Sequence, residues 1–127
     1  MALSRRRSRR KISGGRYKPL LKRSGNQHQL PSLVSIGKRR IKRIRIRAGK
    51  IKLRLLTMSI VNLYDPFSKK HFLAKIESVV ESPSNRNFIR RNIMMKGSVI
   101  KTDKGLARIT SRPGQEGSIN AVLLRKV

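Results

Sequence analysis

Cationic side chains alternate with apolar side chains over residues 38–56. The stretch reads Lys-Arg-Arg-Ile-Lys-Arg-Ile-Arg-Ile-Arg, then Ala48-Gly49, then Lys-Ile-Lys-Leu-Arg-Leu-Leu. Lysine and arginine neutralise phosphate groups, and an arginine guanidinium can donate two parallel hydrogen bonds to one phosphate. The spacing therefore indicates a surface that binds a polyanion. The simpler alternative is a basic surface that is only solvated.

The period-2 alternation predicts two half-buried strands that meet at Ala48-Gly49. A two-residue loop there would place Ile46 opposite Ile51 and Arg45 opposite Lys52. Every apolar residue would then face an apolar one, so we expect a hairpin with one apolar face and one cationic face. The glycine supplies the positive φ that such a turn requires.

The net charge is extreme and unevenly distributed. The 127 residues include 33 Lys and Arg against five Asp and Glu, which gives a formal charge of +28. Residues 1–64 contain 20 of these cations and no acid. Such a charge opposes compaction by self-repulsion and is typical of proteins that bind nucleic acid. The length suits one domain and a tail.

Residues that could perform catalysis are sparse. The two histidines are isolated, no glycine-rich phosphate loop is present, and the absence of cysteine excludes disulfides and cysteine-based zinc sites. We therefore expect no enzymatic activity, no metal and no cofactor. Apolar runs fall short of the ~18 residues of a membrane span, so we expect no membrane partner. The Arg/Ser-rich start also has the composition of an organelle transit peptide, but it lacks an amphipathic apolar stripe.

Residues 1–37 are expected to form an extended basic arm rather than a domain. Ser4–Lys11 is nearly all Arg and Lys, and such a block repels itself until it meets phosphates. Gly14-Gly15 lets the backbone bend sharply. Tyr17 either stacks on a base or packs on a neighbouring surface. Ser24–Ser35 is polar and contains a proline, which predicts irregular structure.

Turn signals divide residues 38–127 into about six short strands and one helical turn over 87–92. This pattern predicts a mainly β fold, a small six-stranded antiparallel barrel-like domain. Asp103-Lys104-Gly105 is expected to be a tight hairpin loop with Gly105 left-handed. Arg112-Pro113-Gly114 fits a type II turn. The strands expected after the hairpin are 57–64, 71–82 (with a further short strand starting at Val79-Val80), 98–102, 106–110 and 119–124.

Aromatic residues are few, and most are placed where a core would use them. A protein that stacks successive unpaired bases needs an exposed aromatic platform. We therefore expect this chain to recognise the shape and backbone of a folded RNA, with the arm entering crevices between helices. The five aromatic residues are Tyr17, Tyr64, Phe67, Phe72 and Phe88.

Several motifs together resemble one family of ribosomal proteins. They are Ser8–Lys11 continuing into Gly14–Lys18, Ile36-Gly37, Arg47-Ala48-Gly49, Arg90–Ile93, Lys96-Gly97, Thr110–Gly117 and Asn120–Leu123. The Thr-Ser-Arg-Pro-Gly-Gln segment is the most specific of them. With these motifs the chain resembles, over nearly its whole length, the small-subunit ribosomal protein family eight of the eukaryotic and archaeal ("e") type. Its short length resembles the archaeal members.

The resemblance implies a six-stranded barrel-like β domain over residues 38–127, an arm threaded into small-subunit ribosomal RNA, and no catalysis. It also implies neighbouring ribosomal proteins as partners, a cytoplasmic location in the small subunit, and no homo-oligomer. Two departures concern local geometry. Ser24–Gln29 lacks the family's Tyr-Glu-Leu-Gly, and Ala48 stands where a glycine is usual, which suggests a variant turn.

The candidate RNA-binding residues come from the arm, the hairpin and the barrel loops. Two other functions fit the same charge: an assembly factor that binds precursor ribosomal RNA, and a small basic DNA-compacting protein. The candidates are Arg5, Arg6, Arg7, Arg9, Arg10, Lys11, Gly14, Gly15, Arg16, Tyr17, Lys18, Lys22, Arg23, Lys38, Arg39, Arg40, Arg43, Arg45, Arg47, Lys50, Lys52, Arg54, Arg90, Arg91 and Arg112.

Overall fold

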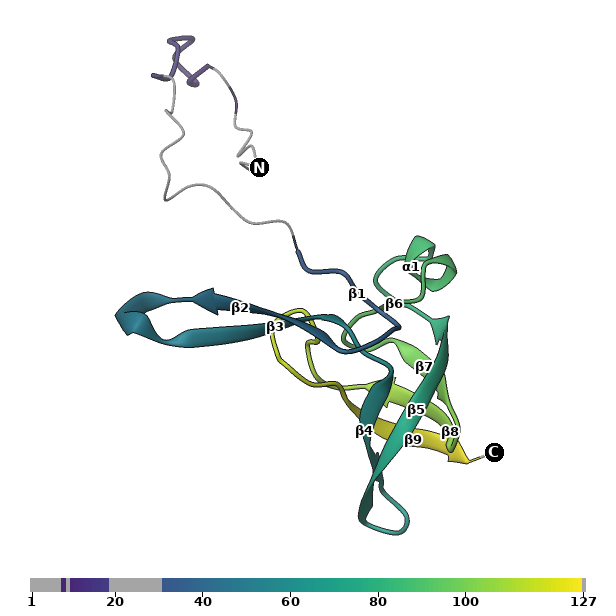
Figure 1. The fold of residues 1–127 in the computed structure, drawn as a ribbon. Coiled ribbons are helices and arrows are strands. Elements are labelled where there is room, and N and C mark those ends of the chain that lie inside the picture. Colours follow the sequence, from purple (N-terminus) through teal and green to yellow (C-terminus); the bar gives the residue numbers. More distant parts are fainter. Residues whose placement is uncertain (1–7, 9, 19–30, 127) are drawn as a thin grey trace. The chain divides into compact units, whose positions relative to one another are not determined.

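Two β-sheets make up the fold in the computed structural model, which describes residues 8, 10–18 and 31–126 (Figure 1). Contacts divide the chain into a unit of residues 1–31 and a unit of residues 32–127, and both sheets belong to the second. The first sheet, in the order β2-β3-β1-β6, contains β1 (Val34–Ser35), β2 (Arg40–Arg45), β3 (Ile51–Thr57) and β6 (Ile93–Met94). The second sheet is a closed barrel in the order β4-β5-β7-β8-β9, made of β4 (Ile60–Asp65), β5 (Lys70–Glu81), β7 (Val99–Thr102), β8 (Gly105–Ile109) and β9 (Asn120–Lys126).

The predicted mainly β class with a small barrel is confirmed, and the strand arrangement differs in detail. The barrel contains five strands where six were expected, because β1, β2, β3 and β6 form a sheet of their own. It is also not wholly antiparallel, since β4 and β9 pair in parallel and close it, with Leu63 opposite Ala121. Local turn signals predict antiparallel neighbours, and they carry no information about a pair so distant along the chain.

Two of the predicted strands have different limits in the structure. The expected strand 57–64 is interrupted at Met58-Ser59, where the chain passes from the first sheet into the barrel. The stretch 71–82 is one strand, β5, and does not restart at Val79-Val80. Register shifts after Ile76 and after Val79 bend β5, so that its first half pairs with β4 and its second half with β7.

Most of the remaining local predictions are confirmed. The helical turn is α1 (Asn87–Arg90), and Asp103-Lys104 connects β7 to β8 with Gly105 at a φ of 132°. The strand β1 was not predicted, since it lies in the part of Ser24–Ser35 expected to be irregular. Its Val34 is fully buried and pairs with Met94 of β6. Residues 24–30 of that stretch lie outside the described residues.

The core is aliphatic. Alternation along β4 buries Val61 and Leu63 and leaves Asn62 between them exposed. No aromatic side chain belongs to the buried core of the described residues, so the expectation that most aromatics are internal is wrong. Phe67 is 81% exposed. The largest fully buried apolar side chains are Val34, Leu55, Val61, Leu63, Met94, Ile100, Ile109 and Ile119.

The Arg112–Gln115 turn differs from the predicted type II turn. The amides of Gln115 and Glu116 both donate to the carbonyl of Arg112, at 2.9 and 3.0 Å. Gly114, however, does not have a positive φ, so the turn continues helically and is not type II. The glycine is required for space instead, because a Cβ on it would lie 2.7 Å from the carbonyl oxygen of Ser32.

Replacing this glycine with alanine is expected to destabilise the fold. In Gly114→Ala the new methyl group would meet backbone that must shift, and such overpacking costs about 1–3 kcal/mol. Urea denaturation of the purified protein measures the change. Gly15→Ala is the matched control, because the nearest heavy atom to its Cβ position is 3.8 Å away. Equal stability of Gly114→Ala and wild type would show that Ser32 does not hold this close approach in solution.

Candidate nucleic-acid interface

The β2–β3 hairpin extends away from the barrel and carries the alternating cations (Figure 1). Its turn was located correctly, since Lys50 donates its backbone N–H to the carbonyl of Arg47 at 3.4 Å. Ala48 and Gly49 between them have φ values of 58° and 69°. Both are left-handed, as in a type I′ turn. Ala48 therefore has the left-handed conformation of a type I′ turn, and the variant turn geometry expected from its alanine is not seen in these φ values.

The predicted register of the hairpin is wrong by one residue. Beyond the turn, Ile46 donates its N–H to the carbonyl of Lys50, so that β2 has one extra residue beside the turn. Arg45 therefore pairs with Ile51, and Ile44 with Lys52. In the three pairs nearest the turn a cationic residue faces an apolar one, so the expected division into one apolar and one cationic face does not occur there.

Exposure of the hairpin explains why this register is tolerated. Ile51 is 65% exposed and Leu53 is 41% exposed, so near the turn the alternation does not correspond to a buried face. Only at the base, where Leu55 enters the core, does the ladder meet the barrel. Since neither face near the turn is buried, the hydrophobic pattern does not fix the pairing there. Both faces consequently present cations beside apolar side chains.

The Arg112–Gly117 loop fixes the base of the hairpin. The N–H of Leu55 is shared between the carbonyls of Pro113 and Glu116, at 3.3 and 3.2 Å. The Lys52 ammonium donates to the Gln115 side-chain oxygen at 2.6 Å. A Cβ on Gly117 would lie 3.3 Å from the side chain of Leu53. The most specific motif of the sequence thus orients the hairpin on the barrel.

The described part of the arm contains a tight turn. Gly14 has a φ of 81° and donates its N–H to the carbonyl of Lys11 at 2.9 Å, which confirms that the backbone bends at this glycine. Arg10 forms a β-bridge with Arg16, and its guanidinium donates to the carbonyl of Gly14 at 3.2 Å. The Lys11 ammonium lies 5.8 Å from the centre of the Tyr17 ring. The turn thereby presents several cations close together.

The predicted site residues occupy three regions. Those of the described arm are all exposed. On the hairpin, Lys52 and Arg54 are half-buried and the other candidates are exposed. Arg112 is exposed in the loop that holds the hairpin base, whereas Arg90 and Arg91 precede β6, at the edge of the first sheet opposite β2. The candidates outside the described residues are Arg5, Arg6, Arg7, Arg9, Lys22 and Arg23.

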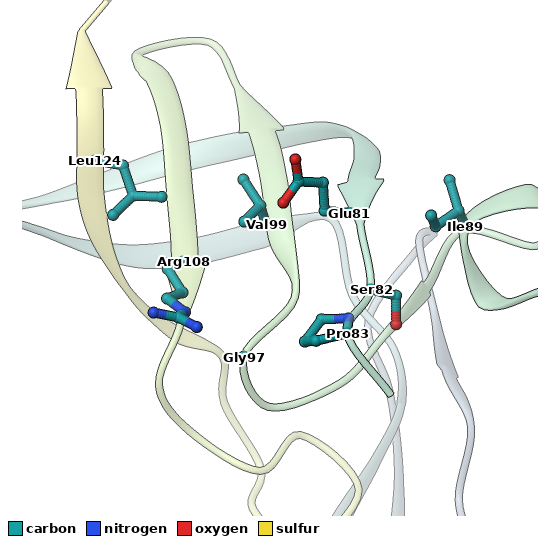
Figure 2. A pocket seen from close by; sticks show the side chains of 8 residues that line it. All are labelled: Glu81, Ser82, Pro83, Ile89, Gly97, Val99, Arg108 and Leu124. Carbon is teal, nitrogen blue, oxygen red and sulfur yellow. The ribbon is translucent and has the colours of Figure 1, made fainter. Parts of the chain in front are cut away.

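Two cations that were not among the candidates occupy comparable positions. Lys42 is exposed on β2, opposite Arg54. Arg108 of β8 lines a shallow pocket with Val99 and Leu124 on the barrel (Figure 2). The strand pairing is needed to place Arg108 beside Val99 and Leu124, because the residues next to it in the sequence do not indicate these neighbours.

Other kinds of site are not found in the described part of the chain. Within residues 8, 10–18 and 31–126, no group of three His, Cys, Asp or Glu side chains could hold a metal ion. No helix among the described residues is long and apolar enough to cross a membrane.

These features define a small, highly basic β-barrel protein with a projecting cationic hairpin. Residues 4–124 match the sequence model of the family described as Ribosomal protein S8e. The chain belongs to this family, as its resemblance to family eight of the "e" type predicted.

Similar proteins from archaea carry the name "Small ribosomal subunit protein eS8". The one from Sulfolobus acidocaldarius is 47% identical over 119 residues, which cover 92% of this chain and 93% of the relative. The one from Methanobrevibacter smithii is 39% identical over 98% of this chain and 100% of the relative. The one from Nanoarchaeum equitans is 47% identical over 75% of each chain. These coverages agree with the short, archaeal-like form that the sequence indicated.

Proposed function

We propose that this protein is a structural constituent of the small ribosomal subunit and that it binds ribosomal RNA through the β2–β3 hairpin and the N-terminal arm. Membership of the S8e family and the names of its relatives support the ribosomal role. The formal charge of +28 supports RNA as the ligand. Neighbouring ribosomal proteins would be its other partners, in cytoplasmic subunits, and no catalytic step is part of the proposal.

The projecting hairpin is the observation that carries this proposal. Phosphates that approach it would displace condensed counterions, which gives affinity without sequence recognition. The apolar side chains beside the cations add a second kind of contact. Ile51 lies opposite Arg45, and Leu53 lies opposite Arg43. Such a mixed surface suits the wide, shallow minor groove of A-form RNA, which exposes riboses and base edges between its phosphates.

The fixed hairpin base favours tight binding. Because the Arg112–Gly117 loop already holds Leu55 and Lys52, the base of the hairpin loses little conformational freedom when it binds. Arg90 and Arg91 lie beyond the opposite edge of the first sheet from β2. We therefore infer that the domain contacts two RNA segments and holds them together, with the arm reaching a third.

Crosslinking in mature subunits tests the proposal. Ultraviolet crosslinks would be induced in salt-washed small subunits, and the RNA fragments attached to this protein would be sequenced. We expect a few sites clustered on small-subunit ribosomal RNA, attached to peptides from residues 8–18 and 38–54. Fragments found only in precursor particles would instead identify an assembly factor. Crosslinks scattered over unrelated nucleic acids would contradict the ribosomal role.

A further inference from the structure

One area of the outer face of the barrel has no charged side chain, in contrast to the hairpin. It is formed where β4 pairs with β5 on one side and with β9 on the other. It contains a pocket of about 530 Å³ whose lining includes no Lys, Arg, Asp or Glu. In a chain with 33 cations, this uncharged area calls for a different kind of ligand group from a phosphate. The side chains that define it are Asn62, Tyr64, His71, Leu73, Asn120 and Val122.

Two rings form one wall of the pocket. Tyr64 and His71 are directly opposite each other across β4 and β5. Their ring centres are 4.9 Å apart and their planes are inclined by 35°. Leu73, on the same face, is 69% exposed and extends the apolar surface. Flat apolar groups of this kind are the surfaces on which unpaired bases stack.

Two side-chain amides form the floor. Asn62 donates a hydrogen bond to the side-chain oxygen of Asn120 at 3.0 Å, across the parallel β4–β9 pair. This bond uses one N–H of Asn62 and one lone pair of Asn120, so the Asn62 carbonyl oxygen and the Asn120 NH₂ group keep their capacity to accept and to donate. An acceptor beside a donor matches the edge of a nucleobase, which presents the same two functions side by side. The floor can therefore recognise a base without using a charge.

Cations lie at the margins of the uncharged area. Arg108 of β8 is exposed opposite Val122, which in turn lies opposite Tyr64. Neighbouring strands are about 4.8 Å apart, so the backbone of Arg108 is about 10 Å from that of Tyr64. Figure 2 shows the Arg108 side chain in the adjacent pocket. On another side, Lys75 is exposed on β5, two residues beyond Leu73 and opposite Ile60.

From this arrangement we propose that the β4–β5–β9 face binds one unpaired nucleobase of RNA. The base stacks on the Tyr64–His71 wall and hydrogen-bonds the free ends of Asn62 and Asn120, while Arg108 contacts a flanking phosphate. This inference rests on RNA being the ligand of the protein, but it concerns a surface separate from the hairpin and the arm. An uncharged floor between cationic margins matches a nucleotide better than it matches an apolar protein surface.

A photo-crosslinking experiment with the full-length protein tests this site. The probe is an RNA hairpin that carries one 4-thiouridine in a single-nucleotide bulge, and the reference is the same hairpin with that nucleotide paired. Fluorescence anisotropy measures total RNA binding, and mass spectrometry locates the crosslinked residue. Asn62→Leu/Asn120→Leu removes the amides without changing the charge. Asn87→Leu, on exposed α1, is the matched control.

We expect the bulged probe to crosslink to Tyr64 or His71 and the paired probe not to do so. The double variant should lose about thirtyfold in that crosslink, since two hydrogen bonds of about 1 kcal/mol each correspond to that factor. Its total RNA binding should match that of wild type and Asn87→Leu. The comparison of the two probes on wild type needs no variant, so a misfolded variant would not weaken the test.

The possible failures are distinct. RNA binding with crosslinks confined to the arm and hairpin would overturn the base site. Equal crosslinking of both probes to Tyr64 would overturn it as well, because an unpaired base would then not be required. An absence of binding to either RNA would contradict the proposed function itself.

Discussion

Deletion of residues 1–23 is expected to leave the barrel folded and to weaken incorporation into small subunits by at least about tenfold. The deletion removes ten of the 33 Lys and Arg residues. It removes none of the core, which starts at Val34. Since the lost cations repel one another in the free protein, the melting temperature should stay the same or rise slightly. The loss should therefore appear in assembly and not in folding.

Competition between the two forms gives the clearest measurement. Full-length and truncated protein are mixed in equal amounts during reconstitution of small subunits, and their ratio in the purified particles is determined by mass spectrometry. Circular dichroism verifies the fold of the truncated form. An arm of unchanged length with its Lys and Arg replaced by Gln is the matched control, because it separates charge from length. Equal incorporation of all three proteins would exclude a role for the arm.

Removal of three cations from the hairpin is expected to weaken RNA binding on the order of 100-fold at 0.1 M salt. Arg43, Arg45 and Arg47 are exposed near the turn and are changed together to Gln. Each lost phosphate contact should lower the slope of log affinity against log salt by about 0.7–0.9. Binding curves measured from 0.1 to 0.5 M salt should therefore converge with those of wild type as salt increases.

The control distinguishes local contacts from overall charge. Lys69, Lys70 and Lys96 are exposed and lie outside the hairpin, and their change to Gln removes the same charge. We expect that variant to bind RNA within about threefold of wild type, since exposed charges beyond about 10 Å are largely screened at 0.1 M salt. If both triple variants lose the same affinity, net charge attracts the RNA and the hairpin has no special part in binding.

The position of the hairpin follows from the sequence, and its register does not. Alternation of charged and apolar residues specifies two strands, and Gly49 marks the turn. Pairing is normally fixed by burial of one face, because a slip of one residue would expose the apolar set. Here Ile46 and Ile51 are exposed in any case, so this penalty is absent near the turn. The hydrogen bond from Ile46 to Lys50 then decides the pairing.

Long-range pairing explains most of the other differences between prediction and structure. The parallel contact of β4 with β9 and the short strand β1 both depend on partners far away in sequence. The burial of the aromatic residues was predicted wrongly for a related reason. Tyr64 alternates correctly along β4, but the closed barrel is filled by Val61 and Leu63, and Tyr64 is directed outward. Small aliphatic side chains fill such a narrow barrel, so the rings remain at its surface.

In the motif Thr110–Gly117 the position of the turn was predicted correctly, but the physical reason given for its glycine was wrong. The turn at Pro113-Gly114 was located correctly, yet the glycine is needed for the approach of Ser32 and not for its φ. A similar approach occurs at Gly117 and Leu53. Neither contact could be predicted, because each joins the motif to a segment more than fifty residues earlier in the chain.

Closure of the barrel by β9 has a consequence during protein synthesis. Because β9 alone joins β8 to β4, the barrel is an open sheet until residue 126 has been added. At 5–20 residues per second, the edge of β4 waits roughly 3–12 s for its partner. Throughout this time the nascent chain exposes an unpaired strand edge and the 20 cations of residues 1–64. A chaperone that shields both from cellular RNA should therefore raise the yield of folded protein.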